Sequence, residues 1–170
     1  MNLNRILSLA GTSAAVIGAG TAIALAATPQ KITPSGVGQV QIGKTYTELH
    51  DKGLIGKIQK GCELAGPKAR AAQLKAPLVG SVNLSSSHPR KITDITISGG
   101  AKARGVGVGA TIARIKKAFP SAKVDHSTDK QFELTFVRVP KGGGGKLEFG
   151  VSTKTHKVTV IGVPFIAFCE

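Results

Sequence analysis

Hydrophobic residues recur at helical spacing in one segment of this chain. Ile112, Ile115 and Phe119 lie three and four positions apart. Thr111 precedes them as a suitable N-cap, and Pro120 ends the segment because proline cannot continue a helix. The pattern predicts an amphipathic helix that packs its apolar side on a core.

A second, shorter helix is expected after Thr45. Thr45 and Glu48 have the spacing of a capping box, in which each side chain accepts a hydrogen bond from the other residue's backbone N–H. Tyr46 and Leu49 mark its inner side. The remaining hydrophobic runs are bounded by turn residues, which is typical of antiparallel strands. We expect strands at residues 62–65, 78–85, 91–98, 132–139, 146–152 and 157–163.

Two of these patterns occur twice. The run from Val40 to Thr45 resembles residues 106–111, and residues 91–95 resemble residues 157–161, in both cases 66 positions later. Two matches at one offset, between segments that otherwise diverge, indicate a duplication. We therefore expect an α+β fold of two tandem repeats. Each would be a helix, or short helix pair, packed on a three- to four-stranded antiparallel sheet. The strands of both halves would form either a single curved sheet or two sheets that meet at an angle.

The expected repeats are residues 36–100 and 101–170. Residues 1–27 read as a signal peptide, with a basic residue, an uncharged apolar stretch and a small-x-small motif. An uncleaved membrane anchor is the alternative, since about 20 apolar residues can span a bilayer. Residues 28–35 are expected to form a flexible leader.

Composition adds two features to this picture. The chain has 23 Lys and Arg residues against 9 Asp and Glu, which gives a net charge of +14 and favours attraction to polyanions. A soluble cationic exported protein is the alternative interpretation. Export also favours one disulfide, between Cys62 and Cys169, which would link the repeats. Two separate buried thiols are the alternative.

No catalytic or metal-ligating pattern is visible in the sequence. The four histidines lack the spacing of a zinc site, and the glycine run at residues 105–109 does not match a phosphate-binding motif. We therefore expect a protein without enzymatic activity, cofactor or bound metal.

Two clusters of basic residues are the candidate binding sites. The first is Arg114, Lys116 and Lys117 on the outer side of the second predicted helix, with Lys123 beyond it; the second is Lys68, Arg70 and Lys75 in the connection at residues 66–77. Either cluster could contact an anion or an acidic partner, and an ordinary solvated surface is the alternative. Neither contains the aromatic residues that stack on bases, so sequence-specific nucleic-acid binding is not expected.

The [IV]-G-x-T motif at residues 42–45 and 108–111, followed by a helix and three strands, resembles the secreted β-lactamase inhibitor proteins. It also resembles their wider superfamily, which includes a small outer-membrane assembly lipoprotein, in an uncharacterised actinobacterial branch. The resemblance implies tandem helix-on-sheet repeats with a concave binding face. This chain departs from the family in having one cysteine per repeat and few aromatic residues.

Together these patterns predict an exported, non-enzymatic binding module in the cell envelope or medium. Its expected partner is another exported or envelope protein. The alternative is a cationic envelope protein that binds polyanions such as teichoic acid or anionic lipid.

Overall fold

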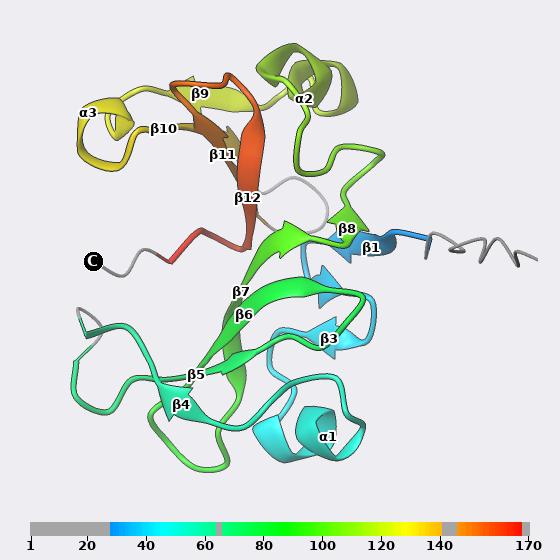
Figure 1. The fold of residues 1–170 in the computed structure, drawn as a ribbon, viewed down its shortest axis with the longest axis vertical. Coiled ribbons are helices and arrows are strands. Elements are labelled where there is room, and N and C mark those ends of the chain that lie inside the picture. Colours follow the sequence, from blue (N-terminus) through cyan, green and yellow to red (C-terminus); the bar gives the residue numbers. More distant parts are fainter. Residues whose placement is uncertain (1–27, 64–65, 141–145, 168–170) are drawn as a thin grey trace, which may run out of the picture.

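The computed structural model describes residues 28–63, 66–140 and 146–167, which form two sheets and three helices (Figure 1). The large sheet contains, in spatial order, β4 (Gln59–Lys60), β5 (Arg70–Gln73), β6 (Val79–Leu84), β7 (Ile92–Gly99), β12 (Val158–Val163), β11 (Leu147–Ser152), β10 (Leu134–Val139) and β9 (Lys123–Asp125). The small sheet contains β3 (Val40–Gln41), β2 (Gly36–Val37), β1 (Gln30–Thr33) and β8 (Ala101–Lys102). The helices are α1 (Tyr46–Asp51), α2 (Ile112–Ala118) and α3 (Asp129–Phe132).

The two halves of the chain share the large sheet. β7 pairs antiparallel with β12, and Ile97 lies opposite Ile161 in that pairing. Four strands from the first half therefore continue directly into four from the second. Both isoleucines are fully buried, so the junction is part of the core rather than a polar boundary between domains.

The expected fold class is wrong in this respect. Separate three- to four-stranded sheets, each covered by its own helix, would give two small bodies. Instead the structure is mostly strand, with one eight-stranded sheet built from both halves and a second sheet of four strands. A unit of about 65 residues buries little apolar surface alone, and pairing β7 with β12 gives both halves one core.

The disulfide expected between Cys62 and Cys169 is not part of the described fold. Cys62 is buried in the connection between β4 and β5, and Cys169 lies outside the described residues. The link between the halves that the structure does show is the strand pairing of β7 with β12.

The structure also contains two strands that were not predicted from the sequence. The leader at residues 28–35 contains β1, which pairs in parallel with β8 and in antiparallel with β2. The connection at residues 66–77 contains β5. β5 lacks large hydrophobic residues, but Ala71 and Ala72 are buried in the sheet.

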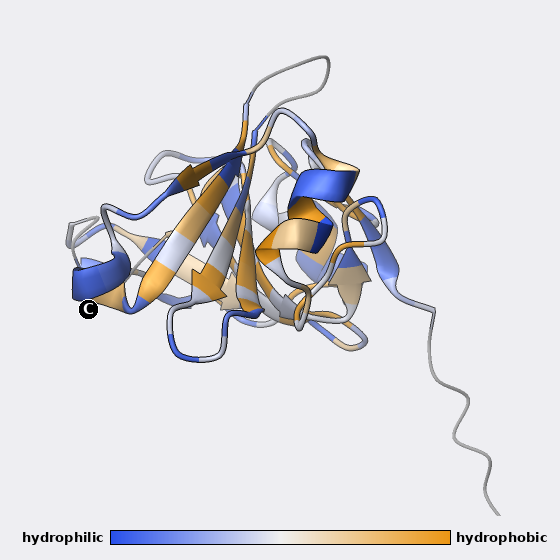
Figure 2. Cartoon of the chain, turned by 90° about the horizontal axis from the view of Figure 1, so that it is seen from above, coloured by the Kyte–Doolittle hydropathy of each residue, from blue (hydrophilic) through white to orange (hydrophobic). Residues whose placement is uncertain are grey.

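One face of the large sheet is covered by the small sheet and by α1 and α2, which lie together on the right in Figure 1. Leu49 of α1 and Ile115 of α2 are fully buried in the common core. Phe119, at the end of α2, packs against Phe149 of β11 with ring centroids 5.7 Å apart. Figure 2 shows the hydrophobic residues concentrated along the strands and on the helix sides that face them.

The same backbone contacts hold the start of both helices. The N–H of Gly43 donates to the carbonyl of Ile92 at 2.9 Å, and 66 residues later the N–H of Gly109 donates to Val158 at 2.8 Å. Both glycines have positive φ, +83° and +86°, which glycine adopts without steric cost. Each turn leads to a threonine N-cap, and at Thr45 the expected capping box with Glu48 is confirmed.

Candidate functional site

The uncovered face of the large sheet carries a recess. In Figure 1 this is the left face, where the C-terminal segment and the connection after β4 project beyond the strands. Two adjoining hollows of about 670 and 400 Å³ share Cys62, Asn83 and Ala167 in their walls. We call this combined hollow the sheet recess.

The floor of the sheet recess consists of polar side chains in register on three neighbouring strands. Gln73 of β5 lies opposite Ser81 of β6, and Ser81 lies opposite Thr96 of β7. Within the described residues, none of these three side chains makes a hydrogen bond to another protein group. They can therefore donate to and accept from a ligand without breaking an existing contact.

One wall of the recess is the segment that follows β12. The N–H of Ile166 donates to Oε2 of Glu148 at 2.9 Å, and Ile166 is buried. The chain approaches Gly162 so closely that a Cβ atom there would lie 2.2 Å from the carbonyl carbon of Phe165. Phe165 itself is 45% exposed at the edge of the recess.

Asp94 is the titratable group beneath the recess. Its residue is 5% exposed, and its carboxylate accepts hydrogen bonds from Asn83 Nδ2 at 2.8 Å and Thr93 Oγ1 at 2.9 Å. Burial raises the pKa of Asp94, because desolvation disfavours the charged form more than the two hydrogen bonds favour it. The carboxylate is thus occupied by structural contacts.

The second cluster of basic residues is divided by the structure. Lys68 and Arg70 line the larger hollow of the recess. The Arg70 guanidinium also donates to the carbonyls of Pro67 and Ala69, so part of its hydrogen-bonding capacity holds the connection before β5. Lys75 lines a different, much smaller hollow and does not join them.

The first cluster is also only partly brought together. Arg114 and Lys117 of α2 line a hollow of about 470 Å³ with Arg104. Lys116 turns elsewhere, since its Nζ donates to the carbonyl of Ala122 at 2.5 Å. Lys123 lies on β9, the edge strand of the large sheet.

The carboxylates of the described residues are largely used by other partners. Ion pairs with lysine or arginine involve Lys44, Lys60, Arg138 and Lys154 among the described cations. The three cations around the α2 hollow are not in this group. Their charge is therefore available to an external anion.

The acidic and histidine side chains near α3 form local contacts. Asp129 binds His126 Nδ1 at 2.8 Å and accepts from Thr135 at 2.8 Å, whereas Asp125 binds Arg138 and the N–H of Ser127. No group of three metal-ligating side chains is found among the described residues. The same residues contain no helix long and apolar enough to cross a membrane.

Arg104 and the polar recess floor were missed by sequence reasoning. Arg104 lines two hollows but belongs to neither of the basic clusters identified in the sequence. The sequence does contain a feature that singles out Arg104: position 104 lies 66 residues after Gly38, so a glycine in one half corresponds to an arginine in the other.

Comparison with known proteins finds no matching family model, no similar curated protein and no similar solved structure.

Proposed function

We propose that this chain is an exported, non-enzymatic binding protein that recognises another exported or envelope protein through the sheet recess. The observation that carries the proposal is the in-register set Gln73, Ser81 and Thr96, which lines the hollow and makes no hydrogen bond within the described protein. Ser81 and Thr96 are half-buried in the hollow, and Gln73 is exposed beside them.

The chemistry of the recess suits a protein segment. Hydroxyl and amide side chains can pair with the N–H and C=O groups of a peptide. Phe165 offers an exposed aromatic ring at the rim, and aromatic residues are common among the side chains that dominate binding energy. Lys68 lines the same hollow and favours an acidic residue in the partner. We expect no reaction there, because the carboxylate of Asp94 is held by Asn83 and Thr93.

A second function, binding of an anionic polymer, is supported by the α2 hollow. Arg104, Arg114 and Lys117 surround it, and its lining includes no acidic residue. Three close cations without carboxylate partners would attract teichoic acid or anionic lipid head groups through the field of a chain with net charge +14.

A pull-down from the organism's own envelope and secreted fractions tests both functions. Ser81→Arg places a large side chain on the recess floor and should abolish capture of a protein partner. The double variant Arg114→Glu and Lys117→Glu should leave that capture intact and remove retention on polymer. Lys52→Glu is the control, since Lys52 is an exposed residue at the end of α1.

Washing at high salt separates the outcomes. Counterions screen contacts between exposed charges, whereas a packed interface is much less sensitive. A partner that persists in high salt and is lost in Ser81→Arg supports the proposed function. Equal capture by Ser81→Arg and the unmodified protein would reject the recess as the binding site.

A further inference from the structure

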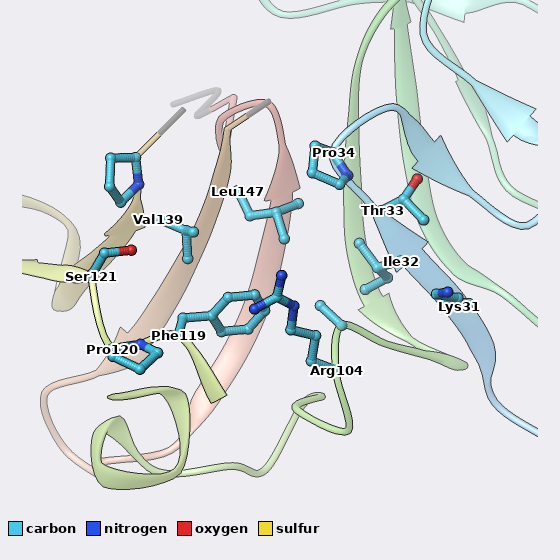
Figure 3. Close-up of a pocket in the computed structure, with 12 residues that line it drawn as sticks. Lys31, Ile32, Thr33, Pro34, Arg104, Phe119, Pro120, Ser121, Val139 and Leu147 are labelled. Carbon is cyan, nitrogen blue, oxygen red and sulfur yellow. The ribbon is translucent and has the colours of Figure 1, made fainter. Parts of the chain in front are cut away.

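A cleft separate from the sheet recess lies between β1 and the strands of the second half (Figure 3). Its volume is about 490 Å³, within the range of roughly 300 to 1,000 Å³ usual for small-molecule sites. Half-buried Val139 and three prolines give it an apolar lining, and the core residues Ile32, Phe119 and Leu147 lie beneath, almost fully buried. Arg104 extends into the space between Ile32 and the Phe119 ring.

The backbone of Arg104 is in a conformation that arginine rarely adopts. Its φ is +46°, and Gly105 follows with φ +77° in a two-residue turn between Ala103 and Val106. Turns with two positive φ values favour Asn-Gly, Asp-Gly or Gly-Gly. A residue with a Cβ atom in the left-handed region costs about 1 kcal/mol or more.

In the first half of the chain, glycine occupies the position that corresponds to Arg104. Gly38, 66 residues before Arg104, has φ +52° in the turn between Val37 and Val40. The positive φ at the first turn position is therefore adopted by glycine in one half and by arginine in the other, although the next residue has positive φ only in the second half. Strain at a residue whose side chain enters a cleft is a reason to look for a function of that side chain.

The Arg104 guanidinium has few partners of its own. It lies over the Phe119 ring at 5.1 Å from the centroid and makes one long contact, 3.5 Å, to the carbonyl of Ala118. Among the described residues no acidic side chain lines the cleft, and Lys31 adds a second positive charge at its side. The planar guanidinium can bind a carboxylate through two parallel hydrogen bonds.

The rest of the lining offers few hydrogen-bonding groups. Pro34, Pro120 and Pro140 border the cleft, and proline has no backbone N–H to donate. The hydroxyls of Thr33 and Ser121 are the polar side chains besides the two cations. A peptide in this position would replace only part of its hydrogen bonds to water, whereas a hydrocarbon chain has no hydrogen bonds to lose.

We propose that the Arg104 cleft binds a single-chain carboxylate amphiphile, such as a medium-chain fatty acid. The carboxylate pairs with the guanidinium of Arg104, and the acyl chain lies along Val139, Pro120 and Pro140. This function is independent of partner recognition in the sheet recess.

Isothermal titration of the full chain with dodecanoate, below its micellar concentration, tests the proposal. We expect saturable one-to-one binding, and at least tenfold weaker binding of dodecanol, which lacks the charge, and of acetate, which lacks the chain. Arg104→Gly copies Gly38 and should fold normally, yet bind dodecanoate at least tenfold more weakly. Arg114→Ala removes a neighbouring cation outside the cleft and should change affinity less than twofold, as should Ser81→Arg.

Three results would overturn the proposal. Arg104→Gly could bind dodecanoate as tightly as the unmodified chain, which would place binding elsewhere. Dodecanol could bind equally well, which would remove the role of the carboxylate. Arg114→Ala could lose as much affinity as Arg104→Gly, which would indicate general attraction by surface charge.

Discussion

The carboxylate of Glu148 connects the C-terminal segment to the large sheet, because its Oε2 accepts a hydrogen bond from the backbone N–H of Ile166 at 2.9 Å. Its other oxygen accepts from Nε of Arg138 at 2.7 Å. The Glu148 side chain is 9% exposed; its contact with Ile166 is buried, and its contact with Arg138 is partly buried. One acidic residue thus fixes a wall of the sheet recess.

Replacing Glu148 by Ala should destabilise the protein by about 2 to 3 kcal/mol, since a buried N–H and part of an ion pair lose their acceptor. Glu148→Gln keeps an oxygen for the Ile166 N–H and should lose less. Urea unfolding of both variants measures the difference. Equal stability of Glu148→Ala and the unmodified protein would show that the C-terminal segment contributes nothing to the fold.

Gly162 provides a second test of the same wall. An added Cβ atom would lie 2.2 Å from the carbonyl carbon of Phe165, so the segment or the strand must move. We expect Gly162→Ala to lower stability by about 2 kcal/mol, as overpacking commonly does. Gly99→Ala is the matched control, because its Cβ would approach only side-chain atoms of Val79 at 3.4 Å. Hydrogen exchange near Ile166 should rise in Gly162→Ala and stay unchanged in Gly99→Ala.

Local structure was the part of the fold that sequence could predict. The capping box at Thr45, the helix containing Ile115 and the strand that became β12 all depend on residues close in the chain. β5 was missed because two alanines replace the expected large residues, and β1 because a four-residue strand shows little alternation.

The union of the two halves could not be read from periodicity. Pairing of Ile97 with Ile161 is a contact between residues far apart in sequence, and a local pattern specifies neither the partner strand nor the register. The candidate sites likewise include some that were visible in the sequence and one that was not. Basic clusters were visible in composition, but the position of Arg104 depends on a backbone conformation that only its comparison with Gly38 could have suggested.

Arg104 also yields a prediction about stability. Arg104→Gly removes the left-handed strain, which offsets the lost contact with Phe119 of about 0.5 to 1 kcal/mol. Its stability should therefore stay within about 1 kcal/mol of the unmodified protein. Arg104→Val should lose about 2 kcal/mol, since a β-branched residue tolerates positive φ poorly. Thermal unfolding of the pair separates backbone strain from side-chain contacts; similar losses in both variants would contradict the strain.

The capping box predicts that the stability of the protein decreases at acid pH. The backbone N–H of Thr45, its hydroxyl and the Lys44 ammonium lower the pKa of Glu48 to about 2. A lowered folded-state pKa means that the stabilisation is present above the unfolded pKa, near 4.5, and is lost as pH falls through about 2. Glu48→Gln should be less stable than the unmodified protein at pH 7, and the difference should vanish near pH 2. Thr45→Ala should cost about 1 kcal/mol at pH 7.

The pH dependence of stability that Asp94 causes should be opposite in sign to that of Glu48. Burial raises its pKa, so the folded state favours the protonated carboxyl, and this contribution to stability is present at low pH and is lost as pH rises through the folded-state pKa. Asp94→Asn keeps an oxygen to accept from Asn83 Nδ2 and removes the charge that burial disfavours. The variant should be more stable than the unmodified protein at pH 7, and the gain should shrink as pH falls through the raised pKa of Asp94 and level off below its ordinary value of 3.8. Urea unfolding across that range measures it. A gain independent of pH would mean that packing, and not the buried charge, accounts for the difference.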